Sequence, residues 1–229
     1  MPKIKQTLKN IQRSIFEMFG IDRLSKPSLN DLDTKLASYL PVKNGVFVEL
    51  GANDGFNMSN TYYLEKIRGW HGVLVEPIPE QYEKAKKRRP KSKVFNAACV
   101  DFDYTDPQVT MTYCDLMSIV QGAFKDPARE AEHIRKGNEV QGITSYTLSV
   151  PARTLTSILD ESNVTHIDFL SLDVEGFEAN VLKGLDFSRF APDWILIEIR
   201  DKAEIDALLL PRYECVTQLA HLDYLYHKR

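Results

Sequence analysis

The chain has 229 residues, 43% hydrophobic and 27% charged, with a formal net charge of −3. This balance fits one large α/β domain, or one domain with a short extension, whose core needs no disulfide. It excludes the strongly basic surface of a typical nucleic-acid-binding protein, and no apolar run is long enough to span a bilayer. We expect no signal peptide, because polar residues interrupt any apolar run near the N-terminus. Cys99, Cys114 and Cys215 match no metal-binding spacing, so we also expect free thiols and a cytoplasmic protein.

Residues 1–40 form a predicted N-terminal helical extension to a domain that spans 41–229. Apolar residues recur at helical spacing among lysines up to Gly20: Ile4, Leu8, Ile11, Ile15 and Phe19. Such a stripe usually packs on its own domain. The alternative is peripheral contact with a membrane or with a partner. A second helix should run from Asn30 or Asp31 to Leu40, because Asn30 suits an N-cap and Pro41 blocks continuation.

From residue 45 onward, short apolar runs alternate with helical segments. Strands are predicted at 46–50, 72–76, 93–98, 167–173 and 193–199, with helices at about 59–68 and 80–89. This pattern predicts a mostly parallel sheet with helices on both faces. Two further strands, 213–219 and 222–226, should pair antiparallel. The basic run from Lys84 to Lys93 is interpreted as the solvated end of a helix rather than as an anion site.

Residues 101–150 interrupt the alternation and read as an insert, with a strand at 109–113 and a helix at 126–136. Long inserts at the carboxyl ends of strands often form lids or substrate walls, so this one is a candidate substrate lid. His133 is the only histidine expected near it. His71 and His166 precede strands and should lie at the opposite edge of the sheet.

The segment Glu49-x-Gly51-x-x-x-Gly55 lies between a strand and a helix. Glycines there let the backbone approach a ligand, and the helix amides point at the same place. The dinucleotide fingerprint GxGxxG is absent, because Asn53 occupies its middle position. Glu49 adds a carboxylate that suits the amino group of an amino-acid moiety. This pattern counts against a nicotinamide oxidoreductase.

Further candidate binding residues lie at the ends of the next two strands. Glu76 ends the second strand, where a carboxylate can accept hydrogen bonds from ribose hydroxyls. Asn96 and Ala97 end the third, beside the expected position of adenine. Together they predict a pocket for an adenosine with an amino-acid tail, as in S-adenosylmethionine (SAM). The alternative is a set of ordinary strand-to-helix turns with acids placed by chance.

Asp173-Val174-Glu175-Gly176 follows the fourth strand, and Glu198 lies near the end of the fifth. Ligands of open α/β sheets bind beyond these strand ends. Asp173, Glu175 and Glu198 are therefore the candidate catalytic residues, as base or acceptor anchor. One alternative is that Asp173 or Glu175 caps the next helix. Another is that the three carboxylates hold a divalent ion, although we assign no metal.

Several segments resemble the FkbM family of methyltransferases: 47–55, 59–61, 75–77, 96–98 and above all Leu170-Ser171-Leu172-Asp173-Val174-Glu175-Gly176. The resemblance implies a class I SAM methyltransferase, Rossmann-like fold with strand order 3-2-1-4-5-7-6 and an antiparallel strand 7. It also implies O-methylation, often of hydroxyls on sugars or natural products. A family histidine often follows the position of Glu198, and this chain has Ile199 and Arg200 there instead, so no histidine of that strand can be the base.

The resemblance also implies roles for single residues. Glu49, Gly51, Asn53 and Gly55 would surround the methionine part of SAM, Glu76 would hold the ribose, Asn96 and Ala97 would border adenine, and Asp173 and Glu175 would face the reactive methyl. The expected cofactor-binding set also takes in Ala52, Asp54, Asn60, Pro77 and Asp173. We expect a small-molecule or glycan acceptor and no nucleic-acid partner. The alternatives are methylation of a nitrogen and a non-catalytic protein of this fold that binds partners.

Overall fold

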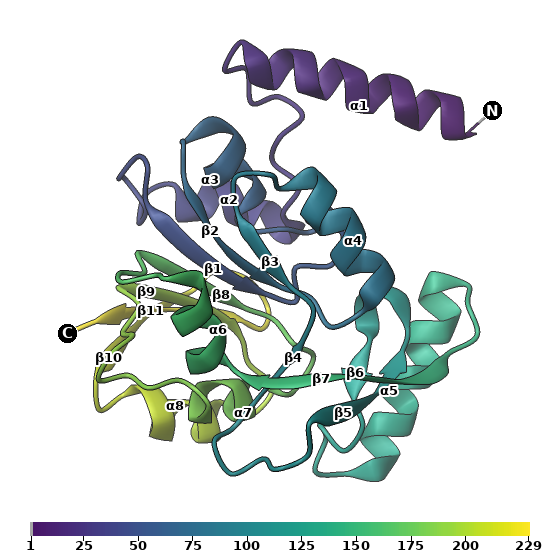
Figure 1. The fold of residues 1–229 in the computed structure, drawn as a ribbon, viewed down its shortest axis with the longest axis vertical. Coiled ribbons are helices and arrows are strands. Elements are labelled where there is room, and N and C mark those ends of the chain that lie inside the picture. The colour runs from purple at the N-terminus through teal and green to yellow at the C-terminus, as the bar shows by residue number, and fades with distance from the viewer. Residues whose placement is uncertain (1) are drawn as a thin grey trace.

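The computed structural model describes residues 2–229, without the side chains of residues 2–4 and 6, and shows a central sheet flanked by helices (Figure 1). The order of this sheet is β10-β11-β9-β8-β1-β2-β3. Its strands are β1 (Val46–Leu50), β2 (His71–Val75), β3 (Lys93–Phe95), β8 (Phe169–Leu172), β9 (Trp194–Glu198), β10 (Tyr213–Gln218) and β11 (Asp223–Lys228). Only β11 runs against its neighbours, β9 and β10. The mostly parallel sheet and the order 3-2-1-4-5-7-6 are thus confirmed.

Helices cover both faces, because β1 sends alternate side chains to opposite sides. Val48 and Leu50 pack in the core under α6 (Leu155–Ser162), α7 (Glu178–Lys183) and α8 (Lys202–Leu209). Phe47 packs on the other side with residues of α2 (Leu32–Leu36) and α3 (Tyr62–Ile67). The β2–β3 crossover carries α4 (Pro79–Arg88).

The predicted third strand, 93–98, is wrong in one respect: the chain divides it between two sheets. After β3, Asn96 and Ala97 form no strand, and β4 (Ala98–Val100) pairs with β7 (Tyr146–Thr154) of a second sheet. The cause is a pair of hydrogen bonds to the end of β2: the Asn96 side-chain amide donates to the carbonyl oxygens of Glu76 and Pro77 and thereby turns the chain. The second sheet has the order β4-β7-β5-β6.

The insert builds most of this second sheet. It supplies β5 (Gln108–Tyr113), a single 3₁₀ turn η2 (Asp115–Met117), β6 (Ile119–Val120) and α5 (Pro127–Gln141), whose N-cap is Asp126. The predicted strand and helix of the insert are therefore confirmed, with the helix extending further than expected. Figure 1 shows this unit beside the carboxyl end of the main sheet.

The N-terminal helix α1 (Pro2–Met18) forms where predicted, and Figure 1 shows it lying along the outside of the domain. The prediction that its apolar stripe packs on the domain is wrong, because Leu8, Ile11, Ile15 and Phe19 are exposed. The side chain of Ile4 lies outside the described residues. No helix within residues 2–229 is long and apolar enough to cross a membrane.

The second helix is shorter than predicted. Asn30 lies in the 3₁₀ turn η1 (Leu29–Asp31) with a φ of 55° and caps nothing, and α2 follows it. Leu32, Leu36 and Leu40 are buried in the core against α3 and the sheet. The second helix of the predicted extension therefore packs against the rest of the chain.

Candidate active site

A cavity of about 350 Å³ opens at the carboxyl ends of β1, β2, β8 and β9. Most of the predicted site residues line it: Glu49, Gly51, Asn53, Asn60, Glu76, Pro77, Ala97, Asp173, Glu175 and Glu198. The predicted residues Ala52, Asp54, Gly55 and Asn96 are not part of its lining. The insert contributes the facing wall, which includes Met111, Met117 and Val120. Residues of both sheets thus line the same cavity.

Gly51 is required by the fold at this point. Its φ is +78°, and a Cβ atom there would lie 1.9 Å from the carbonyl oxygen of Asp173. Gly55 likewise has a φ of +75°, and a Cβ would lie 3.0 Å from the Cα of Ala85 on α4. These glycines let β8 and α4 approach the turn, and Gly51 also lines the cavity. That the turn lets the backbone approach a ligand stays a prediction.

Glu49 holds the segment that follows the glycine turn. Its carboxylate accepts hydrogen bonds from Ser59 Oγ (2.9 Å), the backbone amide of Asn60 (2.9 Å) and Thr61 Oγ1 (2.7 Å). Arg89, fully buried, lies 3.6 Å away and pairs with Glu65 at 2.9 Å. The sequence-based interpretation of the basic run as solvated is therefore wrong at Arg89. Both Glu49 oxygens already have protein donors.

Asn60 is held by this network at the cavity wall. Its side-chain amide donates to Ser171 Oγ on β8 at 3.1 Å. Its Oδ1 atom is buried and has no hydrogen-bond partner among the described residues. A buried acceptor without a donor is uncommon in folded proteins. Asn60 therefore offers an acceptor to a ligand that carries N–H or O–H groups.

Glu76 is buried at the end of β2. Its oxygens accept from the backbone amides of Asn53 (2.7 Å) and Ile78 (2.8 Å), and burial raises its pKa to about 7. Asn96 fixes the carbonyl of Glu76 from behind, while Ala97 lines the cavity. We expected Asn96 to border the ligand, but its side chain supports the turn after β2 and is not part of the cavity lining.

Asp54 also supports the turn from outside the cavity. Its carboxylate accepts from the backbone amides of Phe56 (2.9 Å) and Asn57 (2.8 Å) and pairs with Arg88 at 2.6 Å. These contacts order the loop that carries Asn57 and Met58 into the cavity lining. Asp54 therefore shapes the wall without reaching the ligand space.

Carboxylates converge where β8 and β9 end. One carboxylate oxygen from each of Asp173, Glu178 and Glu198 lies within 4.8 Å of the other two. Although Asp173 faces the cavity, the surrounding protein desolvates it, and this raises its pKa well above the ordinary value. The charges of Glu198 and Glu175 raise it further. Asp173 therefore competes for protons far more strongly than a free aspartate does.

Neither Asp173 nor Glu175 caps the next helix, so that alternative is excluded. Glu178, which sequence analysis missed, accepts from the backbone amides of Val174 (3.1 Å) and Gly176 (2.9 Å) and holds the turn. Glu175 has a φ of +56° and turns toward Arg200, whose guanidinium lies 2.5 Å from it and 3.2 Å from Glu198. The converging carboxylates thus include Glu178 in place of Glu175.

Arg200, Ser171 and the insert residues were also missed as parts of the site. Ser171 is a polar residue inside an apolar strand, which is a usable signal, whereas nothing in the sequence marks Met111 or Met117. His133 lies behind this wall, with Nε2 3.1 Å from the Met117 carbonyl oxygen and 3.7 Å from Glu175. Its burial lowers its pKa.

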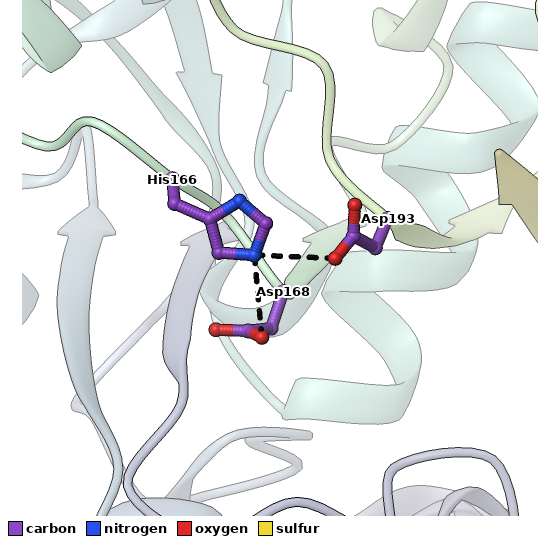
Figure 2. Close-up of side chains that lie close together, drawn as sticks. All are labelled: His166, Asp168 and Asp193. Carbon is purple, nitrogen blue, oxygen red and sulfur yellow. Dashed lines mark ion pairs between the residues drawn. The ribbon is translucent and has the colours of Figure 1, made fainter.

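A second polar cluster lies at the amino ends of β8 and β9, where His166 was expected. Figure 2 shows His166 between two aspartates, with Nε2 3.1 Å from Asp193 and 3.4 Å from Asp168. Asp168 also accepts from the backbone amide of Val46 at 2.7 Å. This cluster ties the starts of three strands together at the edge opposite the cavity.

The family model for the methyltransferase FkbM domain matches residues 49–226. The chain belongs to the FkbM methyltransferase family. No curated protein matches it.

Solved structures similar to this FkbM methyltransferase include a human methyltransferase 10 domain containing protein (10% identity, 100% and 97% of the two chains covered, TM-score 0.48). Others are a putative caffeoyl-CoA O-methyltransferase from Staphylococcus aureus (9%, 96% and 91%, 0.47) and an RNA methyltransferase from Salinibacter ruber in complex with S-adenosyl-L-homocysteine (11%, 87% and 90%, 0.43). The family assignment rests on the FkbM match.

The cofactor of this FkbM methyltransferase is SAM, and the cavity fits it. Its volume is within the range of small-ligand sites. SAM carries a sulfonium and an ammonium group, and carboxylates of Glu49, Glu76 and Asp173 line the cavity. The unpaired Oδ1 of Asn60 adds an acceptor.

Proposed function

We propose that this FkbM methyltransferase methylates a hydroxyl group on a sugar, a glycoconjugate or a natural product. The observation that carries the proposal is the convergence of carboxylates at the cavity, where oxygens of Asp173, Glu178 and Glu198 lie within 4.8 Å of one another; desolvation by the surrounding protein and these neighbours raise the pKa of Asp173. SAM supplies a methyl group that is already activated. The protein must therefore align the acceptor and take up its proton, and a carboxylate of raised pKa is suited to that task.

The cofactor half of the site would be formed by the turns after β1, β2 and β3. Glu76 retains free lone pairs for ribose hydroxyls, and the small Ala97 leaves room for adenine. Asn60 would accept a hydrogen bond from the ammonium group through its unpaired Oδ1, with Glu49 supplying negative charge behind it. Gly51, Ala52, Asn53, Asp54, Gly55, Pro77 and Asn96 would act mainly by shaping these turns.

The acceptor half would lie between Asp173 and the insert. Asp173 would accept the proton of the acceptor hydroxyl as the hydroxyl oxygen attacks the methyl group of SAM. Arg200 holds Glu175 and Glu198 in place at this end of the cavity. Met111, Met117 and Val120 provide an apolar wall, and the insert would act as the substrate lid.

A second candidate is methylation of an amine. Four acidic residues, Asp173, Glu175, Glu178 and Glu198, interact with a single Arg200, so acidic groups outnumber the basic one at this end of the cavity. A cationic amine would be attracted there.

The experiment has two stages. Calorimetry with SAM and S-adenosylhomocysteine, with NAD as control, should show binding of the first two alone. Methyl transfer from labelled SAM is then measured on panels of hydroxylated sugars, glycoconjugates and amines. Transfer to hydroxyls supports the proposal, and transfer to amines alone replaces it with the second candidate. Cofactor binding without any transfer would indicate a non-catalytic partner-binding protein.

We also propose a cytoplasmic location. The three cysteines are free, and Cys215 is exposed. An exposed thiol stays reduced most readily in a reducing compartment.

A further inference from the structure

The helix α1 is amphipathic, and its apolar face points away from the rest of the protein. The exposed fractions of five apolar residues are 61% for Leu8, 53% for Ile11, 45% for Ile15, 72% for Met18 and 72% for Phe19. An apolar stripe of this kind is normally buried. Continuous exposed apolar surface on a soluble domain marks a contact with another molecule or with a membrane.

The polar face of α1 makes the contacts with the domain. Arg13 is 7% exposed, and its guanidinium carbon lies 3.7 Å from the centre of the Phe56 ring. Glu17 accepts hydrogen bonds from the hydroxyls of Tyr62 (2.9 Å) and Ser25 (2.8 Å). Because Arg13 and Glu17 are held inward, the stripe on the opposite side must face outward. The orientation is thus built in by specific contacts.

The charges of the helix indicate what the stripe meets. The chain carries a net charge of −3, yet its first 19 residues contain four basic residues and one acid, Glu17. Lys5 and Lys9 are exposed, and Glu17 is turned inward. A second copy of α1 would therefore offer these lysines no exposed acid. Anionic phospholipid headgroups would pair with them, while the stripe enters the acyl boundary.

Exposed apolar residues also lie at the rim of the cavity, on segments next to the one that α1 contacts. The loop under Arg13 runs on to Met58, which is 45% exposed and lines the cavity together with Leu29, 53% exposed. A backbone bridge between Ser28 and Met58 joins the two segments. We propose that α1 lies in the interface of an anionic phospholipid membrane and holds the rim of the cavity at the membrane surface. This proposal does not depend on the identity of the methyl acceptor.

Vesicle co-sedimentation of the full chain tests the proposal. The protein should bind phosphatidylcholine vesicles that contain phosphatidylglycerol, and bind pure phosphatidylcholine much more weakly. The double variant Ile11→Glu/Ile15→Glu should lose binding to both. At about 1 kcal/mol per lysine, Lys5→Glu/Lys9→Glu should weaken binding to the anionic vesicles by at least about 30-fold.

Matched controls are Val216→Glu, an exposed apolar residue on β10, and Lys43→Glu/Lys91→Glu, two exposed lysines away from α1; both should bind like the wild type. Circular dichroism and SAM binding confirm that each variant is folded. No binding to anionic vesicles, or binding that survives Ile11→Glu/Ile15→Glu, overturns the proposal. A dimer in sedimentation equilibrium that this variant dissociates, without vesicle binding, would assign the stripe to a second copy.

Discussion

Asp173 gains its basicity from its neighbours. The backbone amide of Asp173 bonds to the Leu50 carbonyl oxygen, which fixes the residue at the junction of β8 and β1. Desolvation by the surrounding protein and the charges of Glu198 and Glu175 then raise the pKa of its carboxyl. A residue that accepts protons strongly, at the end of a strand and facing a cavity, has the position and the chemistry of a general base.

Replacing Asp173 separates binding from chemistry. Asp173→Asn should retain affinity for S-adenosylhomocysteine and lower turnover on the true acceptor by at least about 100-fold, the usual contribution of a general base. Calorimetry and the labelled transfer assay measure the two quantities. Asp103→Asn, an exposed aspartate in the insert, is the control. Full activity in Asp173→Asn would remove it from the catalytic residues.

The pH dependence of turnover should report the same group. Because Asp173 acts deprotonated, the rate should be low at pH values below its raised pKa and should rise as the pH increases through that pKa. Glu198→Gln removes a negative charge that raises this pKa. The rising limb should therefore move to lower pH, whereas Glu214→Gln, on exposed β10, should leave it unchanged. A limb that stays in place or moves upward in Glu198→Gln contradicts the assignment.

At the scale of elements, the glycine turn joins β1, β8 and α4. Gly51→Ala should destabilise the protein because its Cβ meets the Asp173 carbonyl oxygen. Gly122 is a matched control, with a φ of +81° and open space around it. Both variants lose about 1–2 kcal/mol to the left-handed backbone, and Gly51→Ala should lose about 1–3 kcal/mol more. Urea unfolding measures the difference, and equal losses would exclude the clash.

The buried pair of Arg89 and Glu65 joins α4 to α3. Arg89→Met should lower the free energy of unfolding by about 3–5 kcal/mol, because the buried Glu65 loses its nearest cation and keeps only Lys66, 3.4 Å away, as an ion-pair partner. Arg135→Met removes an exposed ion pair on α5 and should change it by less than about 1 kcal/mol. The comparison of the two urea midpoints is the measurement. A small effect at Arg89 would mean that water replaces its hydrogen bonds.

Most elements of the main sheet follow from the sequence, because strands buried on both faces read as unbroken apolar runs. Asp173 and Glu198 could be placed at the cavity for the same reason, since each lies at the end of such a run, and Glu175 follows two residues after Asp173. Asn96 could not be assigned correctly, because its role depends on the carbonyls of Glu76 and Pro77, which are distant in sequence. The direction of the α1 stripe depends on Arg13 meeting Phe56, which periodicity cannot show.

At the scale of the whole molecule, acids inside the fold couple its stability to pH. The pKa values of Glu76 and Glu175 are raised from 4.5 to about 7 by burial. Between these values the folded state keeps the protons that the unfolded chain has released. As far as these groups contribute, stability should therefore be greatest at and below about pH 4.5, fall by about 1.4 kcal/mol per pH unit and group as the pH rises further, and level off above about pH 7.

Urea unfolding across this range measures the slope. Glu175→Gln should reduce the slope of the free energy of unfolding against pH by the contribution of about one proton. Glu161→Gln, on the exposed end of α6, should leave this slope unchanged. A slope that is identical in the wild type and in Glu175→Gln would show that the folded-state pKa of Glu175 is ordinary.

The division of the third strand has a consequence for protein engineering. The second sheet has a hydrophobic core of its own, which includes Val100, Val109 and Val150, while the turns proposed to hold the cofactor belong to the main sheet. The chain passes between the two at Asn96 and Ala97. Residues 101–145 could therefore be exchanged as a cassette between related enzymes, and we expect such chimeras to keep the cofactor affinity of the recipient and take the acceptor preference of the donor.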